Sequence, residues 1–278
     1  MKTILILTDF SETALHAATY AADLGKQIGA ERLIIYHSYG QVPVATDIPV
    51  PETDSSYLLE FSLRGLEEVE RALRKRLDPS VEVITLADEL PVDVGMKQLI
   101  EQWAVGLVVV GQTGKTGWEK FWIGSHTARL IATCPVNLLI IPKGSVFLSI
   151  DNVLFACELN SIDRTVPTGE VDWWLRSLGA RLLVLNVATG GSALDPDTIP
   201  EQYKLHELLD VFSPQYHYIQ EEDVVDGISK FAVDHHVGLV MAVPKNHNWL
   251  ERVFRRSVSK NLSERTWVPL LLLHAPSV

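Results

Sequence analysis

An internal repeat constrains the fold of this chain more than any other feature of its sequence. The run Ile4–Asp9 aligns with Val153–Glu158 at an offset of 149 residues, and Val105–Val108 aligns with Val237–Val240 at an offset of 132. The alignment at the offset of 132 then holds without a gap as far as Val136. Matches in this order indicate a tandem duplication, so the 278 residues are expected to fold as two similar domains.

The two copies differ in length, and the difference locates an insertion and a boundary. The offset falls by 17, from 149 to 132, so the first copy carries 17 extra residues between its second strand and Gly95. Pro142 ends an apolar run, and Lys143–Ser145 follows it as a natural join. We therefore predict a first domain over residues 1–143 and a second over residues 150–278.

Within each copy, short apolar runs alternate with helical patterns. Ile4–Leu7 has the length of a strand buried on both faces, and Ser11 is a suitable N-cap for the helix that follows. The strands expected in the first copy are Ile4–Leu7, Leu33–Tyr36, Val81–Leu86, Leu107–Val110 and Leu138–Ile141, and the helices between them run over Ala14–Leu24, Leu59–Leu73, Val94–Trp103 and Ser125–Ala132. This alternation predicts an α/β class: two tandem α/β sandwich domains, each with a five-stranded, mostly parallel sheet flanked by helices.

Composition excludes several classes of protein. The apolar runs have the length of strands, so we expect no membrane-spanning helix and no membrane partner. The N-terminus has no signal-peptide pattern, and the two cysteines, Cys134 and Cys157, are too few for a disulfide framework, so a cytoplasmic location is expected. A net charge of -11 disfavours nucleic-acid binding but permits a small anion in a local pocket.

A glycine motif follows the fourth expected strand of the first copy. Gly111, Gly114 and Gly124 let the backbone approach a ligand closely, and Ser125 and Thr127 stand at the start of the next helix. Ligands bind beyond the carboxyl ends of parallel strands, and a helix N-terminus attracts phosphate. The motif therefore predicts a phosphate site, although each glycine taken alone could simply form a turn.

The spacing Gly111-x2-Gly114-x9-Gly124-Ser125 resembles the nucleotide-binding signature of the universal stress protein family. Ile4–Ala14 also resembles that family's first strand and loop, Leu33–His37 its second strand, and Cys134–Val136 the approach to its last strand. The similarity covers the first copy closely and the second loosely. It implies the strand order 3-2-1-4-5 in each copy, and dimers that pair through their fifth strands.

The same resemblance implies an ATP site in the first copy. Asp9 would contact the ribose or adenine side, and Ser38 would line the adenine pocket, where family members usually have valine. The remaining residues would flank the ribose or hold the phosphates: Val110, Gly111, Gly114, Gly124, Ser125, His126 and Thr127. A Mg²⁺ or Mn²⁺ ion would be held through the phosphates, so no metal site formed by protein residues is expected.

The second copy lacks the motif. Val243, Asn246 and Arg256 replace the three glycines, and Glu158 replaces Asp9. Side chains at these positions would occupy the space that a triphosphate needs, which predicts a degenerate copy and one ATP per chain. The alternative is a site for a different anion, because Arg256 and its neighbours bring positive charge.

The resemblance thus implies an ATP-binding stress-response protein that acts as a sensor or regulator. Neither a general base nor a carboxylate pair for Mg²⁺ stands near the expected phosphates, so we expect slow hydrolysis at most and no catalytic residues. Two alternatives stay open: an adenylating or PP-loop-type enzyme of related fold, and an interaction protein that binds no nucleotide.

The two copies are expected to form an intramolecular pseudo-dimer. Pairing Asn137–Ile141 with Pro269–Leu273 would remove two exposed apolar edge strands at once. The family habit of pairing through fifth strands points the same way. Whether two chains then associate into a homo-oligomer is left open by the sequence.

Overall fold

The computed structural model describes residues 2–39, 55–112, 125–189, 196–244 and 268–274. Its N-terminal half contains β1 (Thr3–Leu7), α1 (Glu12–Ile28), β2 (Arg32–Ser38), α2 (Ser55–Arg74), β3 (Glu82–Asp88), α3 (Val92–Trp103), β4 (Leu107–Gly111), α4 (Ser125–Thr133) and β5 (Asn137–Ile141). Its C-terminal half contains β6 (Asn152–Ala156), α5 (Ile162–Thr165), α6 (Thr168–Leu178), β7 (Arg181–Ala188), α7 (Ile199–Leu209), β8 (Gln215–Gln220), α8 (Val224–Asp234), β9 (Leu239–Ala242) and β10 (Leu270–Leu272), with the short 3-10 turns η1 (Pro196–Thr198) and η2 (Asp210–Phe212) on either side of α7.

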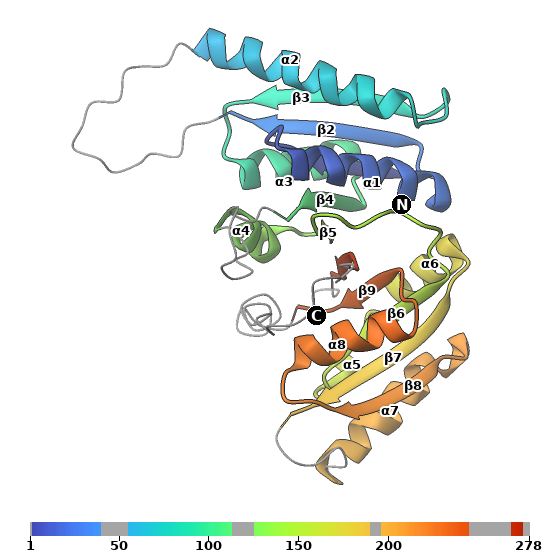
Figure 1. The fold of residues 1–278 in the computed structure, drawn as a ribbon. Coiled ribbons are helices and arrows are strands. Elements are labelled where there is room, and N and C mark those ends of the chain that lie inside the picture. The colour runs from blue at the N-terminus through green and yellow to red at the C-terminus, as the bar shows by residue number, and fades with distance from the viewer. Residues whose placement is uncertain (1, 40–54, 113–124, 190–195, 245–267, 275–278) are drawn as a thin grey trace, which may run out of the picture.

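The strands form one ten-stranded sheet in the order β3-β2-β1-β4-β5-β10-β9-β6-β7-β8 (Figure 1). All pairings within a half are parallel. When the strands of each half are numbered in chain order, both halves have the strand order 3-2-1-4-5. The expected fold class is therefore confirmed, with strand ends that differ from the expected ones by up to two residues. The expected boundaries at 143 and 150 stay a prediction.

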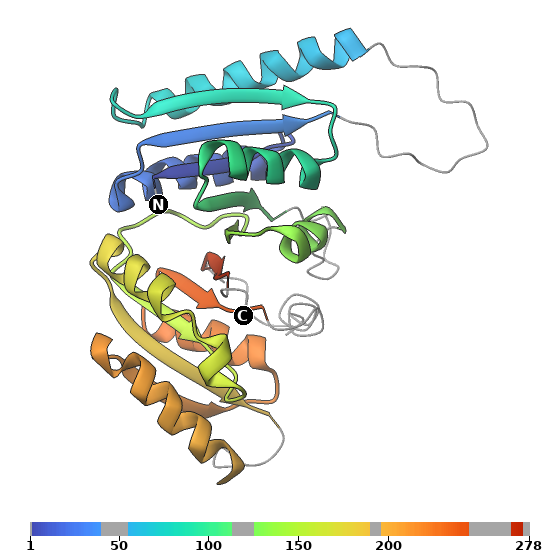
Figure 2. The ribbon, with the colours of Figure 1, turned by 180° about the vertical axis from the view of Figure 1, so that it is seen from behind.

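Two layers of helices cover the N-terminal half of the sheet. Side chains of α1 and α2 pack on one face, against alternate residues such as Ile4 and Ile6. α3 and α4 cover the other face (Figure 2). Their side chains pack there against Leu5 and Leu7. The alternation follows from the pleat of a strand, which sends successive side chains to opposite faces. β1 is consequently buried along its whole length.

The C-terminal half repeats this arrangement, with α6 and α7 on one face and α8 on the other. The core beneath α1 continues without a break into the core beneath α6, where Trp174 is completely buried. Within the described residues, no helix is long and apolar enough to cross a membrane.

The two halves meet at β5 and β10, which pair in antiparallel register, Leu138 opposite Leu272 and Ile140 opposite Leu270. This is the pairing expected from the sequence. Polar side chains flank it: the Asn137 amide donates to Glu170 at 2.6 Å and accepts from the backbone N–H of His274 at 2.9 Å. The junction is therefore a continuous sheet with hydrogen-bonded ends.

Gln27, near the end of α1, also joins the halves. Its amide nitrogen donates to the carbonyl oxygens of Ile150, at 3.2 Å, and of Leu178, at 3.0 Å. Its amide oxygen accepts the backbone N–H of Ile150 at 3.1 Å. The Gln27 side chain thus hydrogen-bonds to both the N–H and the carbonyl of the buried Ile150, which lies in the segment that connects the two halves. It also hydrogen-bonds to the carbonyl of Leu178, the last residue of α6.

The first helix differs between the halves. α1 runs unbroken from its N-cap Ser11, whose hydroxyl accepts from the N–H of Ala14, to its C-cap Gly29 with φ of 68°. In the C-terminal half, the same stretch is split into α5 and α6 by an extended Val166 and by Pro167. Proline excludes a continuous helix because it lacks an N–H and its ring clashes with the carbonyl four residues earlier.

Candidate functional site

The carboxyl ends of β1 and β4 lie side by side at the point where the strand order reverses. In open α/β sheets, this switch point is where ligands bind. The structure places Asp9 just beyond β1, and Val110 and Gly111 at the end of β4. The sequence-predicted residues from these two strands are therefore brought to one edge of the sheet.

Some predicted site residues can be placed only in part. Ser125, His126 and Thr127 form the first turn of α4, of which the helical backbone is described. Gly114 and Gly124 lie outside the described residues. The fully described part of the candidate site therefore comes from β1, β2, β4 and the first turn of α1.

The loop after β1 orients Asp9 by local hydrogen bonds. One carboxylate oxygen of Asp9 accepts from the N–H of Ser11 at 3.0 Å and from its hydroxyl at 2.5 Å. Phe10 between them has φ of 62°, and its N–H donates to the Thr8 hydroxyl at 3.1 Å. Asp9 itself is exposed. The loop thus presents a fixed carboxylate to solvent at the start of α1.

Gly111 is in close contact with the first turn of α1. A Cβ at this position would lie 2.5 Å from the carbonyl oxygen of Thr13 and 2.9 Å from its carbonyl carbon. A side chain cannot fit against backbone at that distance, so glycine allows α1 to pack directly on the end of β4. The sequence motif explained Gly111 by the close approach of a ligand. The structure shows that the packing of α1 against the end of β4 also requires glycine at this position.

Ser38, at the end of β2, is engaged by a neighbouring loop. Its hydroxyl donates to the carbonyl oxygen of Leu90 at 2.5 Å. Leu90 lies in the turn between β3 and α3, so the hydroxyl joins two adjacent loops at the carboxyl edge of the sheet. The serine that replaces the usual valine is therefore hydrogen-bonded within the protein, a role that sequence reasoning did not predict.

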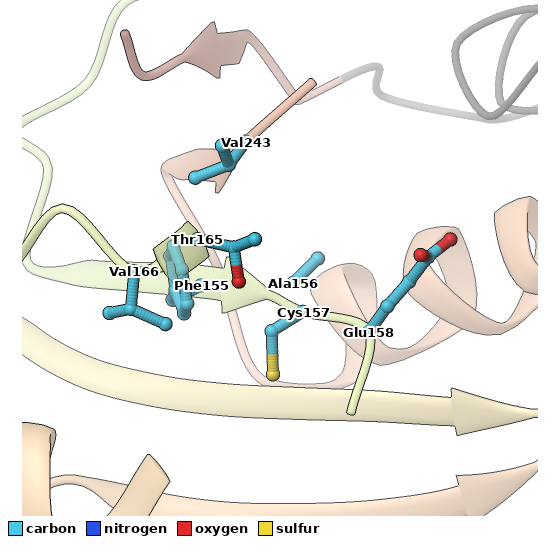
Figure 3. Close-up of a pocket in the computed structure, with 7 residues that line it drawn as sticks. All are labelled: Phe155, Ala156, Cys157, Glu158, Thr165, Val166 and Val243. Carbon is cyan, nitrogen blue, oxygen red and sulfur yellow. The ribbon is translucent and has the colours of Figure 1, made fainter. Parts of the chain in front are cut away.

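The equivalent edge of the C-terminal half contains a small pocket. Its lining residues come from the end of β6, from α5 and from the end of β9: Phe155, Ala156, Cys157, Glu158, Thr165, Val166 and Val243 (Figure 3). Val243 stands at the position of Gly111 and projects over the pocket, whereas Glu158 points away from the other side chains. The walls are mainly apolar, unlike a phosphate site.

The split helix changes the surroundings of Val243. The N-caps Ser11 and Ser161 and the C-caps Gly29 and Gly179 correspond at an offset of 150, so Pro167 stands at the position of Ala17. α5 ends at Thr165, which borders the same pocket as Val243. The proline was visible in the sequence, but its effect on this contact appears only in three dimensions.

The fold defines a class: tandem α/β proteins in which each half has a parallel sheet with the strand order 3-2-1-4-5. Residues 1–142 match the model of the universal stress protein family, and the chain belongs to this family. A universal stress protein of Methanocaldococcus jannaschii is 33% identical over 148 residues, which cover 51% of this chain and 84% of that protein.

Solved structures of other proteins resemble the whole chain. A universal stress protein from Archaeoglobus fulgidus superposes with a TM-score of 0.69 at 17% identity, covering 98% of this chain and 97% of that one. A protein of Pseudomonas aeruginosa described as functionally unknown has a TM-score of 0.60 at 14% identity, covering 99% and 93%. At these identities the likeness is one of fold, and it extends over both halves.

Proposed function

We propose that the N-terminal half binds ATP and that the chain acts as a sensor or regulator in the stress response. The observation that carries the proposal is the position of Gly111. The glycine spacing begins where β4 ends, beside β1 and against the first turn of α1.

The charges at the two helix starts support one orientation of the nucleotide. α1 has Glu12 in its first turn and is capped by Ser11, whereas α4 has no acidic residue in its first turn. The positive end of the α4 dipole therefore suits the phosphates. The Asp9 carboxylate suits hydroxyl donors of the ribose, because an ionised carboxylate only accepts hydrogen bonds.

We expect one ATP per chain. Val243 at the Gly111 position and the apolar lining of the pocket argue against a triphosphate in the C-terminal half. The paired β5 and β10 support an intramolecular pseudo-dimer of one binding half and one structural half. Titration calorimetry measures the stoichiometry directly. Two sites per chain, with the second lost on changing Ser257 and Ser259 to alanine, would contradict this assignment.

A bound Mg²⁺ or Mn²⁺ would depend on the phosphates. In the part of the chain that the structure describes, no three His, Cys, Asp or Glu side chains are grouped to hold a metal ion. Asp9 is already oriented by Ser11, and its proposed role is ligand contact. We propose no catalytic residue and slow hydrolysis at most.

The direct test asks whether purified protein carries or binds nucleotide. Heat release followed by absorbance detects a co-purified nucleotide, and calorimetry gives the affinity for ATP. Gly124→Arg imitates the second copy and should abolish ATP binding with unchanged circular dichroism. Gly169→Arg is the matched control, because a Cβ at Gly169 meets no atom within 4 Å and the residue lies in α6, remote from the proposed site.

The same experiments separate the alternatives. An adenylating enzyme would release pyrophosphate from ATP in the presence of an acyl substrate, which the proposal does not expect. An interaction protein would bind no nucleotide in either half. Retained ATP affinity in Gly124→Arg would place the nucleotide elsewhere and overturn the assigned site.

A further inference from the structure

β8 is the last strand of the ten-stranded sheet. Within the described residues it pairs with β7 on one side and with no strand on the other. The outer edge of such a strand presents N–H and carbonyl groups to which another strand can pair, and proteins usually protect it with charged residues or proline. The sequence of β8, Gln-Tyr-His-Tyr-Ile-Gln, contains no Lys, Arg, Asp, Glu or Pro. β8 is therefore an unprotected edge.

The opposite edge of the sheet, β3, carries charged groups. It begins at Glu82 and ends at Asp88, and Arg32 of β2 pairs with Glu82 at 2.6 Å. Arg74 of α2 donates to the carbonyl of Val81, just before β3, at 2.9 Å. A strand added at this edge would have to displace or desolvate these charges, which is costly. Of the two ends of the sheet, β8 is therefore the one that is open to another strand.

One side of α7 lies against β8. Ile199, Tyr203, His206 and Asp210 have the i, i+4, i+7, i+11 spacing of residues on one side of a helix, and we call them the α7 stripe. The His206 ring stacks on Tyr216 with 3.6 Å between ring centroids, and the Tyr216 hydroxyl donates to Asp210 at 2.7 Å. Figure 1 and Figure 2 both show the helix alongside the strand at the end of the sheet.

The first two residues of the α7 stripe are apolar and reach into solvent. Ile199 is 47% exposed and Tyr203, one turn later, is 75% exposed. Tyrosine is enriched in protein interfaces, and truncating an interface tyrosine is often costly. The strand edge therefore offers directional hydrogen bonds, and the helix beside it offers apolar area.

We propose that β8 and the α7 stripe form the contact through which two copies of this chain associate, with their β8 strands paired antiparallel about a two-fold axis. The chain already extends its sheet in this way once, at the antiparallel pair of β5 and β10. An antiparallel pair of identical strands is self-complementary, so the contact closes at two copies. No Lys, Arg, Asp or Glu of one β8 would meet a like charge of the other.

The size of this contact determines its strength. Stable interfaces bury roughly 1,200–2,000 Å² in total. A pair of six-residue strands supplies hydrogen bonds but little apolar area, so the Ile199 and Tyr203 side chains of both copies are needed to approach that size. We therefore expect a dimer that dissociates on dilution. The inference is independent of ATP binding, because neither β8 nor α7 belongs to the proposed nucleotide site.

Sedimentation equilibrium of the full-length chain over a series of concentrations measures the association. Gln215→Glu with Gln220→Glu places an acid at each exposed end of β8, and antiparallel pairing would bring the acids of the two copies close together. We expect this double variant to raise the Kd of the dimer at least about tenfold. Gln98→Glu with Gln102→Glu is the matched control, because it makes the same change of charge at two exposed residues of α3. Its Kd should equal that of the unchanged chain.

Tyr203→Ser tests the α7 stripe separately. It removes an exposed ring without disturbing the core, and we expect the Kd of the dimer to rise about tenfold. Hydrogen exchange followed by mass spectrometry locates the contact. Peptides from β8 should exchange more slowly at high protein concentration than at low concentration, whereas peptides from β3 should not change.

Three results would overturn the inference. The first is a chain that stays monomeric at every concentration, and the second is an assembly that grows beyond two copies. The third is a dimer whose Kd is the same in the unchanged chain, the β8 double variant and Tyr203→Ser, because such a dimer would use another surface. Circular dichroism and thermal unfolding identify any variant that does not fold. If the double variant does not fold, Tyr203→Ser and the exchange of β8 decide.

Discussion

The contact between the first helix and the end of the fourth strand differs between the two halves of the molecule. In the N-terminal half, Ala17 permits a continuous α1, and the Thr13 carbonyl, four residues earlier, packs against Gly111. In the C-terminal half, Pro167 and Val243 stand at the positions of Ala17 and Gly111. A proline displaces the carbonyl four residues before it, which is the group that a side chain at the Gly111 position would strike.

This comparison teaches that the glycine is part of a pair. Where the first helix is continuous, the residue at the end of the fourth strand has to be glycine, as at Gly111. Where that helix is broken, a larger side chain fits at the same position, as at Val243. Val243 in the second copy therefore stands beside a broken helix, so the difference at this position concerns packing as well as the glycine motif. The predictions below test that coupling and the other differences between the halves.

The largest effect is expected from Ala17→Pro, which imitates the second copy. It should lower the free energy of unfolding by about 3 kcal/mol or more, because it breaks a buried helix in its interior. The reverse change, Pro167→Ala, should alter stability by less than about 1 kcal/mol, because that helix is already split. Urea unfolding of both variants measures the difference. Similar losses from the two changes would contradict the comparison.

Gly111→Val should come next. Its side chain would meet the Thr13 carbonyl, which costs about 2 kcal/mol through overpacking, and ATP binding should be lost. The double variant Ala17→Pro with Gly111→Val should lose at least about 1 kcal/mol less than the sum of the single changes, since the proline moves the obstructing carbonyl. Strict additivity in a double-mutant cycle would disprove the coupling. Val243→Gly, the control, should leave ATP affinity unchanged.

A smaller loss is expected at the junction between the halves. Gln27→Ala would leave the N–H and carbonyl of the buried Ile150 without their partners, at a cost of about 1–2 kcal/mol. Gln202→Ala is the control, because among the described residues that amide donates to Thr198, four residues earlier in the chain, and does not join the two halves. Its effect should stay below about 0.5 kcal/mol by the same unfolding measurement. If Gln27→Ala left the free energy of unfolding unchanged, the hydrogen bonds of Gln27 to the connecting segment would contribute little to stability.

The smallest effect concerns pH and the C-terminal half. Burial, and then the proximity of His235, lowers the pKa of His217 from its ordinary 6.5, and its ring Nε2 is buried with no hydrogen-bond partner among the described residues. The unfolded chain then binds the proton first, so stability should fall as the pH falls through 6.5. The loss should stay below about 1 kcal/mol for a half-buried ring. His217→Gln should reduce the difference in the free energy of unfolding between pH 7.5 and pH 5.5. If the variant kept the same difference, other titrating groups would be its cause.

Most of the fold could be predicted from the sequence. The alternation of short apolar runs with helical patterns gave the strands and helices, because local burial sets those periods. The strand order came from the family resemblance instead, since periodicity carries no information on which strands are neighbours. β2 extends to Ser38, two residues beyond its predicted end, because its pairing with β3 continues to Asp88.

The candidate site could be predicted only in part. The glycine motif predicted a role for Gly111, and the family resemblance predicted one for Asp9. The fold places both at one edge of the sheet, and their part in a ligand site stays a prediction. The contact between Ser38 and Leu90 joins residues 52 positions apart, and no spacing rule reveals such a pair. The same applies to the Gln27 side chain, whose partners lie more than 120 residues away.

The antiparallel pairing of β5 with β10 has a consequence for how this protein responds to dilution. Strands that belong to separate chains pair to an extent that depends on protein concentration, whereas β5 and β10 are tethered in one chain at a fixed effective concentration. The half with the glycine motif therefore always faces the half without it, and no exchange of subunits can bring two copies of the same half together at this interface. The contact between the two halves is therefore independent of how much of the protein the cell contains.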